Sequence, residues 1–83
     1  MDPTDIELID WVDHTEFSGW HTADEYHNMP MLCRTVGWVL LENDLCITLV
    51  NTGPQDEEQD LYIGAITIVK SSITKRTKIS GQF

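Results

Sequence analysis

The chain has 83 residues, of which 41% are hydrophobic, so it suffices for one domain with a single small core. Its net charge is −9, and the charge is uneven: residues 1–60 hold all fourteen acidic residues and sum to −13, whereas residues 61–83 sum to +4. Because this net negative charge repels phosphate groups, it excludes extensive binding to duplex nucleic acid. The asymmetry fits either a solubilising acidic face beside a basic edge strand or a molecule with two opposite poles.

Nothing in the sequence directs the chain to a membrane. Residues 1–5 lack the basic start and apolar run of a signal peptide. No stretch approaches the roughly 18 consecutive apolar residues that span a bilayer. We therefore expect a soluble cytoplasmic protein without a membrane partner.

The first segment, residues 6–12, fits two kinds of secondary structure. Its apolar positions 6, 8, 9, 11 and 12 suit a helix face, and Thr4 and Glu7 have the spacing of a capping box. The segment is short, however, and its isoleucines, tryptophan and valine favour a strand. We predict a strand and keep the helix as the alternative.

Residues 14–19 are predicted to form a loop, which leads to a short helix. Thr22 and Glu25 have the capping-box spacing, and Pro30 ends anything helical soon afterwards. The sequence therefore predicts one or two helical turns across residues 23–28.

The second half of the chain is typical of strands. Bulky and β-branched residues predict strands over residues 35–41, 45–50, 62–69 and 74–79, with a polar exposed loop over 51–60 and a brief turn over 71–73. Gly37 indicates a bulge, a bend or a close backbone approach. A hairpin turn over residues 42–44 would place Leu41 opposite Leu45 and Cys46 opposite Leu40.

Five strands with one long first connection predict a mainly β fold, a small SH3-like barrel with a short helix in that connection. Closure into a barrel would remove the exposed edges of a sheet that has no second layer. We expect a single domain over residues 1–79 and a frayed tail over residues 80–83.

Neither catalysis nor a metal centre is indicated. The region with Asp10, Asp13 and the three histidines has no metal-ligand spacing, and there is no phosphate loop or nucleophile elbow. Cys33 and Cys46 are expected to be reduced thiols, because the predicted hairpin keeps them apart. We expect no enzyme, cofactor or metal.

The aromatic and basic residues suggest a binding site. Trp11 and Trp38 are expected in the core, whereas Trp20 and His21 lie in the long connection, where Trp20 would either anchor a partner or pack under the loop. The basic residues of the segment 61–83 are expected to contact phosphate groups. These residues are Lys70, Lys75, Arg76 and Lys78.

Several motifs resemble those of small uncharacterised phage and prophage proteins. They are Asp10-Trp11-Val12-Asp13, Gly19-Trp20-His21, Thr35-Val36-Gly37-Trp38, and Ile66-Thr67-Ile68-Val69-Lys70 followed by Ile73. An Ile-Pro-Lys step is common in those proteins, and Val69 stands here in place of the proline. The resemblance implies phage origin and residence in a bacterial host cell, without an agreed activity.

These observations lead to three hypotheses for function. The protein either sequesters a small anionic, nucleotide-type signal of a host defence system or blocks a host protein, for instance by imitating nucleic acid with its acidic part. The third is a virion or packaging accessory protein. We also expect a homo-oligomer, with residues 74–79 as the contact surface, and expect Arg76→Glu to abolish nucleotide binding without harm to the fold.

Overall fold

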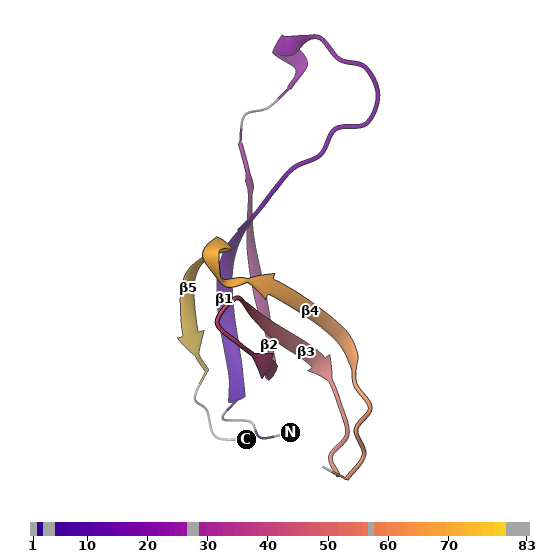
Figure 1. Cartoon of the computed structure of the whole chain (residues 1–83), viewed down its shortest axis with the longest axis vertical. Coiled ribbons are helices and arrows are strands. Elements are labelled where there is room, and N and C mark those ends of the chain that lie inside the picture. The colour runs from indigo at the N-terminus through magenta and orange to yellow at the C-terminus, as the bar shows by residue number, and fades with distance from the viewer. Residues whose placement is uncertain (1, 3–4, 27–28, 57, 80–83) are drawn as a thin grey trace.

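The computed structural model describes residues 2, 5–26, 29–56 and 58–79 and shows a mainly β protein (Figure 1). Five antiparallel strands form one sheet in the order β4-β3-β2-β1-β5. The strands are β1 (Ile6–Asp13), β2 (Met31–Glu42), β3 (Cys46–Thr52), β4 (Ile63–Val69) and β5 (Ile73–Lys78). The predicted tail over residues 80–83 lies outside the described residues.

The ambiguous first segment is a strand, as predicted. β1 is an inner strand of the sheet, because it pairs with β2 on one side and with β5 on the other. Its side chains alternate between two faces, and Glu7 and Ile9 on one face are buried. A helix would instead have turned these two positions to different sides.

The β2–β3 hairpin forms, but the predicted register is wrong. Glu42 pairs with Ile47 and Leu41 with Thr48, and the register shifts at Leu40, between Val39 and Leu41. The turn is fixed by the Asn43 side chain, whose Oδ1 accepts hydrogen bonds from the backbone N–H groups of residues 45 and 46 at 2.9 and 2.8 Å. Such Asx contacts tighten a turn at a position that length alone does not identify.

Gly37 provides a close backbone approach, one of the three roles predicted for it. A Cβ atom at this position would lie 2.8 Å from the Val50 carbonyl oxygen on β3. The bulge of this strand lies further on, at Leu40. Gly37 thus allows β2 and β3 to pack where a larger residue would push them apart.

The predicted helix is shorter than expected. A 3₁₀ turn, η2 (Ala23–Glu25), replaces it within the described residues, and positions 27 and 28 lie outside them. The Thr22 hydroxyl donates to Glu25 Oε1 at 2.8 Å instead of capping a backbone N–H. The capping-box pair is present, but its two side chains bond to each other.

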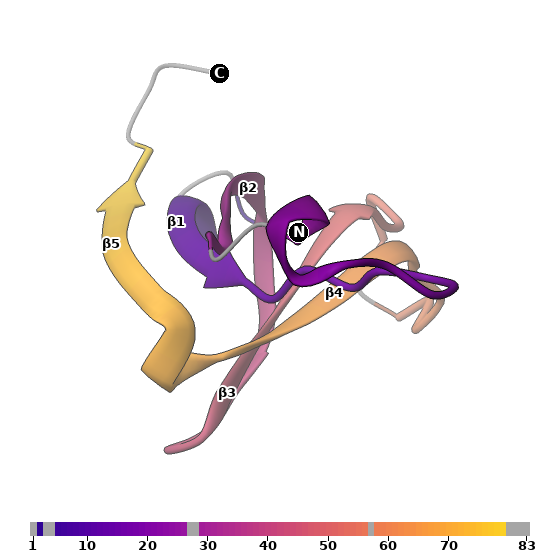
Figure 2. The same cartoon turned by 90° about the horizontal axis from the view of Figure 1, so that it is seen from above.

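A closed barrel is not formed, which corrects the predicted architecture. β4 and β5 lie at opposite ends of the sheet, yet only the 3₁₀ turn η3 (Lys70–Ser72) separates them along the chain. The two edges therefore meet at η3 and diverge from there, as Figure 2 shows from above. The sheet is curled but open, because β4 and β5 do not pair in the described part of the chain.

The core lies on the inner face of this curl. Four buried residues from three strands form one cluster: Ile9, Ile47, Leu49 and Ile68. Four partly buried residues pack against this cluster: Trp11, Val39, Ile66 and Ile73. In a flat sheet β4 and β5 would be about 19 Å apart, so only a curled sheet can bring Ile68 and Ile73 to one cluster. Trp11 packs against this cluster as predicted. Trp38 is partly buried and lies opposite Val50, which is 1% exposed, on the other face of the sheet.

The molecule is far from spherical. Its radius of gyration is 16.4 Å, against about 12 Å for a compact domain of this length. The connection between β1 and β2 is residues 14–30 and is called the arm below; its described part, residues 14–26, 29 and 30, extends away from the sheet (Figure 1). No described helix is long and apolar enough to cross a membrane.

Candidate binding surfaces

An ion cluster of four residues links edge strand β5 to the β2–β3 hairpin. Arg76 donates to both carboxylate oxygens of Glu7 at 2.9 and 2.8 Å and to both of Glu42 at 2.9 and 3.2 Å. Lys70 Nζ lies 2.6 Å from Glu42 Oε2. These hydrogen bonds, first from Arg76 and then from Lys70, lower the pKa of Glu42 to about 2. Glu7 is only 5% exposed, so its pairing with Arg76 is structural.

The ion cluster occupies basic side chains of the C-terminal part that were expected to contact phosphate groups. Arg76 and Lys70 are already bound to carboxylates of this chain, and bonding to Glu7 and then Glu42 raises the pKa of Arg76 further. Lys75 lies opposite Asp10 and Lys78 opposite Glu7 in the β1–β5 register. The acidic first strand and the basic last strand are therefore neighbours, and the fold mixes the charges that the sequence separates.

The ion cluster also bears on the expected effect of Arg76→Glu. A glutamate there would face Glu7 and Glu42, and the buried Glu7 would lose its partner. Unpaired buried charges are strongly destabilising. Arg76 is thus unsuitable as a simple probe of ligand binding.

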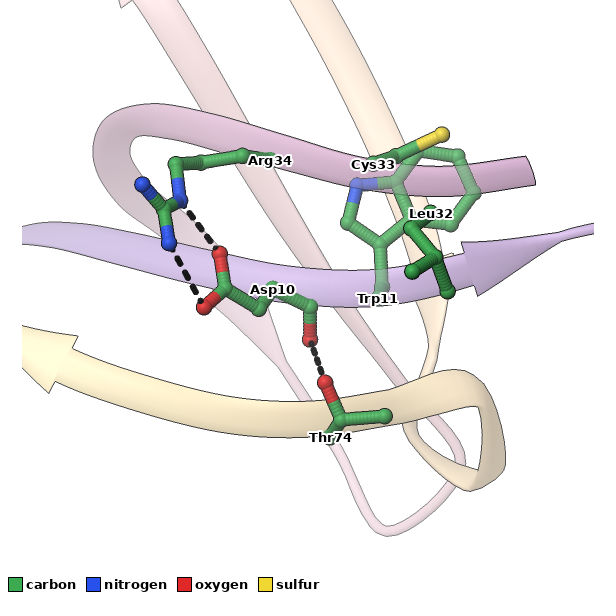
Figure 3. Close-up of a pocket in the computed structure, with 6 residues that line it drawn as sticks. All are labelled: Asp10, Trp11, Leu32, Cys33, Arg34 and Thr74. Carbon is green, nitrogen blue, oxygen red and sulfur yellow. Dashed lines mark hydrogen bonds and ion pairs between the residues drawn. The ribbon is translucent and has the colours of Figure 1, made fainter.

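A hollow of about 410 Å³ lies where β1, β2 and β5 meet, and Figure 3 shows its lining. Arg34 Nε and Nη2 donate to the two oxygens of Asp10 at 2.7 and 3.2 Å. The hydrogen bond from Arg34 is the main cause of the lowered pKa of Asp10. Trp11 Nε1 donates to Thr35 at 3.0 Å, and Thr74 Oγ1 donates to the Asp10 carbonyl at 3.2 Å. Each of these polar groups thus has a hydrogen-bond partner within the chain.

The arm presents a braced aromatic group. Phe17, His21 and Tyr26 meet edge to face, with ring centroids 5.2 to 6.3 Å apart. His21 Nδ1 lies 3.0 Å from Glu25 Oε2, and its Nε2 lies 2.8 Å from the Ser18 carbonyl. These two acceptors, Glu25 first, raise the pKa of His21.

Trp20 lies beside this group, and its side chain is fully exposed at 102% of the reference area. Of the two roles predicted for it, packing under the loop is therefore wrong. An indole exposed to this extent leaves its apolar surface in water instead of burying it against the described residues. It is available to a partner.

The predicted site residues do not form one site. Trp20 and His21 lie in the arm, whereas Lys70, Lys75 and Arg76 lie in η3 and β5 at the sheet, as does Lys78 (Figure 1). The arm extends away from β5, so a stacking tryptophan and a phosphate-binding strand do not face a common ligand.

Sequence reasoning missed Glu7, Glu42 and the rings that brace the arm. Glu7 had no signal, because an acid between Ile6 and Leu8 in a strand normally predicts a position that faces solvent. The aromatic group had none, since Phe17, His21 and Tyr26 meet in a segment without regular periodicity. Cys33 and Cys46 are free thiols, as predicted.

Comparisons with known proteins give no assignment: no family model, no curated protein and no solved structure matches this chain. Within the described residues, no group of three or more histidine, cysteine, aspartate or glutamate side chains could hold a metal ion.

Proposed function

We propose that this chain is a non-catalytic binding protein that blocks a basic protein of a bacterial host cell, with the arm as its binding element. The observation that carries the proposal is the fully exposed Trp20 on a braced, protruding segment. Tryptophan is enriched among the few residues that supply most of the energy of an interface. The phage resemblance of the sequence supports a host protein in the cytoplasm as the target.

The charge of the arm supports a basic partner. Residues 14–30 include Glu16, Asp24 and Glu25 and contain no lysine or arginine. A hydrogen bond from Thr22 is the main cause of a lowered pKa of Asp24, and a hydrogen bond from His21 is the main cause of a lowered pKa of Glu25. Opposite charge across an interface steers association and selects the partner. A complementary surface would combine positive charge with an apolar slot for the indole.

Sequestration of a nucleotide is the weaker hypothesis. It requires free cations beside a stacking ring, but Arg76 and Lys70 are bound within the ion cluster, and Trp20 lies on the separate arm. Imitation of nucleic acid by acidic side chains needs neither free cations nor a stacking ring beside them, and it agrees with the negative charge of the arm.

We also infer that the sheet is an opened variant of the small SH3-like barrel. The long connection between the first two strands, with its short helical turn, lies where such barrels carry their long first loop. The curl and the near-contact of β4 and β5 at η3 support this relation.

The experiment compares Trp20→Ala with Leu61→Ala in a capture from bacterial host lysate, read by quantitative mass spectrometry. Leu61 is a matched control because it is 80% exposed and lies in a different loop. A protein captured by the wild type and by Leu61→Ala, but lost with Trp20→Ala and at high salt, supports the proposal. Its affinity for purified Trp20→Ala should fall by roughly 30-fold, the effect of a hot-spot residue of about 2 kcal/mol.

Two results would contradict the proposal. Equal weakening by both substitutions would show that exposed apolar area, not the arm, holds the partner. Capture that is indifferent to salt would exclude a basic partner.

A further inference from the structure

The edge strand β4 is exposed and has no charged side chain to protect it, although Gly64 near its start has a positive φ of 75°. Residues 61–69 contain no charged residue and no proline. Ile63 is 70% and Val69 53% exposed, although both are large apolar side chains. Natural edge strands are normally blunted by lysine, proline or a covering element. β5 at the other end has such protection, with Lys75, Arg76 and Lys78.

The backbone of β4 is open to a further strand. β4 is the last strand of the sheet and pairs, within the described chain, with β3 alone. An unpaired antiparallel edge offers alternating N–H and C=O groups to another strand. A strand that adds here would extend the sheet without any change in it.

The outer face beside β4 adds a contact surface to this edge. Leu41, Thr48 and Thr67 lie in register across β2, β3 and β4 and line a hollow of about 370 Å³. Leu41 is exposed, as is Leu45 in the adjoining turn. Uncharged side chains, one leucine and two threonines, thus lead across the outer face to the open edge.

The area left exposed agrees with an interface. The chain exposes 6722 Å², about a third more than the roughly 5,000 Å² of a compact protein of this mass. Large apolar side chains of β4 and its neighbours contribute to this area, since Ile63, Val69, Leu41 and Leu45 are each more than half exposed. A stable interface needs about 800 Å² from each partner, which is within this excess.

We propose that β4 pairs antiparallel with β4 of a second copy across a twofold axis near Ile66, which joins two sheets into one. A copy is the fitting occupant because the same uncharged strand faces itself, so two chains of net charge −9 meet where neither carries charge. With this axis Ala65 lies opposite Thr67 of the second copy. The contact surface is therefore β4, whereas the sequence led us to expect residues 74–79.

The test places like charges directly opposite each other. Ala65 and Thr67 are both exposed, so lysine at both positions fits the single chain but opposes lysine across the axis. The variant A65K/T67K should raise the dimer Kd at least 10-fold, measured by light scattering and sedimentation. The full-length wild type should show twice the 9.5 kDa mass of one chain at micromolar concentration.

A charge-reversed partner provides the decisive control. A65E/T67E alone should also be monomeric, and an equimolar mixture with A65K/T67K should restore a dimer containing one of each. Thr77→Lys, an exposed position on β5, should leave the wild-type dimer unchanged. The pairing does not involve the arm, so Trp20→Ala should remain a dimer.

Other outcomes overturn the proposal. A wild type that is monomeric at every concentration would do so, whether or not it binds a foreign strand. So would a dimer that A65K/T67K leaves intact, or a lysine–glutamate mixture that stays monomeric although both variants keep the wild-type circular dichroism.

Discussion

β4 and β5 both end the same sheet and are separated by three residues of chain, yet their chemistry is opposite. β4 is uncharged and buries Ile68 in the core while Ile63 and Val69 remain exposed. β5 has Lys75, Arg76 and Lys78, and Arg76 attaches it to the rest of the fold through carboxylates. The comparison shows that one edge is stabilised by apolar packing and left open, whereas the other is stabilised by ion pairs and protected.

The largest effect should come from breaking the attachment of β5. Arg76→Ala leaves Glu7 charged, 5% exposed and without its bidentate partner. The loss of one partner of a buried pair costs about 3 kcal/mol of unfolding free energy. Urea denaturation followed by circular dichroism measures this loss.

Two control variants sharpen that result. Lys78→Ala, on the same strand, has an exposed side chain and should change the free energy by less than about 0.5 kcal/mol. Glu7→Leu combined with Arg76→Leu should recover most of the loss, since apolar replacement of a buried pair is often neutral. Similar losses for Arg76→Ala and Lys78→Ala would show that β5 is not held by the ion cluster.

The fold was predictable where local chemistry decides it. β-branched runs gave β3, β4 and β5 to within two residues, because such residues suit a pleated, half-buried surface. The hairpin register was not predictable, because the bulge at Leu40 and the Asn43 turn depend on atomic contacts. Barrel closure failed for a related reason: it requires β4 and β5 to pair over their whole length, and strand patterns carry no information on that.

The candidate site was predictable only in part. A tryptophan beside glycine in a long polar connection left two roles open, an anchor for a partner or packing under the loop, and Trp20 is exposed. Counting charges misjudged the basic terminal part, because the count ignores pairing partners. The register of β1 with β5 places Lys75 and Lys78 opposite Asp10 and Glu7, and only the topology reveals it.

The next effect concerns the packing of β4. Ile68 is 2% exposed and lies opposite Ile47 at the centre of the core. Ile68→Val removes one buried methyl group and should lower the unfolding free energy by about 1 kcal/mol. Ile63→Val on the exposed side of the same strand should change it by less than about 0.5 kcal/mol. Equal values from urea denaturation would mean that β4 has no buried side.

The smallest effect is the pH dependence that the ion cluster gives to β5. Hydrogen bonds from Arg76 and Lys70 lower the pKa of Glu42 from 4.5 to about 2 in the folded chain. Because the folded-state pKa is depressed, the unfolded chain binds the proton first on acidification. The stabilisation is therefore complete above pH 4.5 and is lost as the pH falls from there toward 2. Glu42 is partly exposed, so the contribution is at most about 1 kcal/mol.

Urea midpoints measured across this range for the wild type and for Glu42→Gln, which has no charge at this position, should converge at the acidic end. If the difference between them stays constant from pH 6 to pH 2, then Glu42 does not couple β5 to protonation, and the attachment of that edge rests on Glu7 alone.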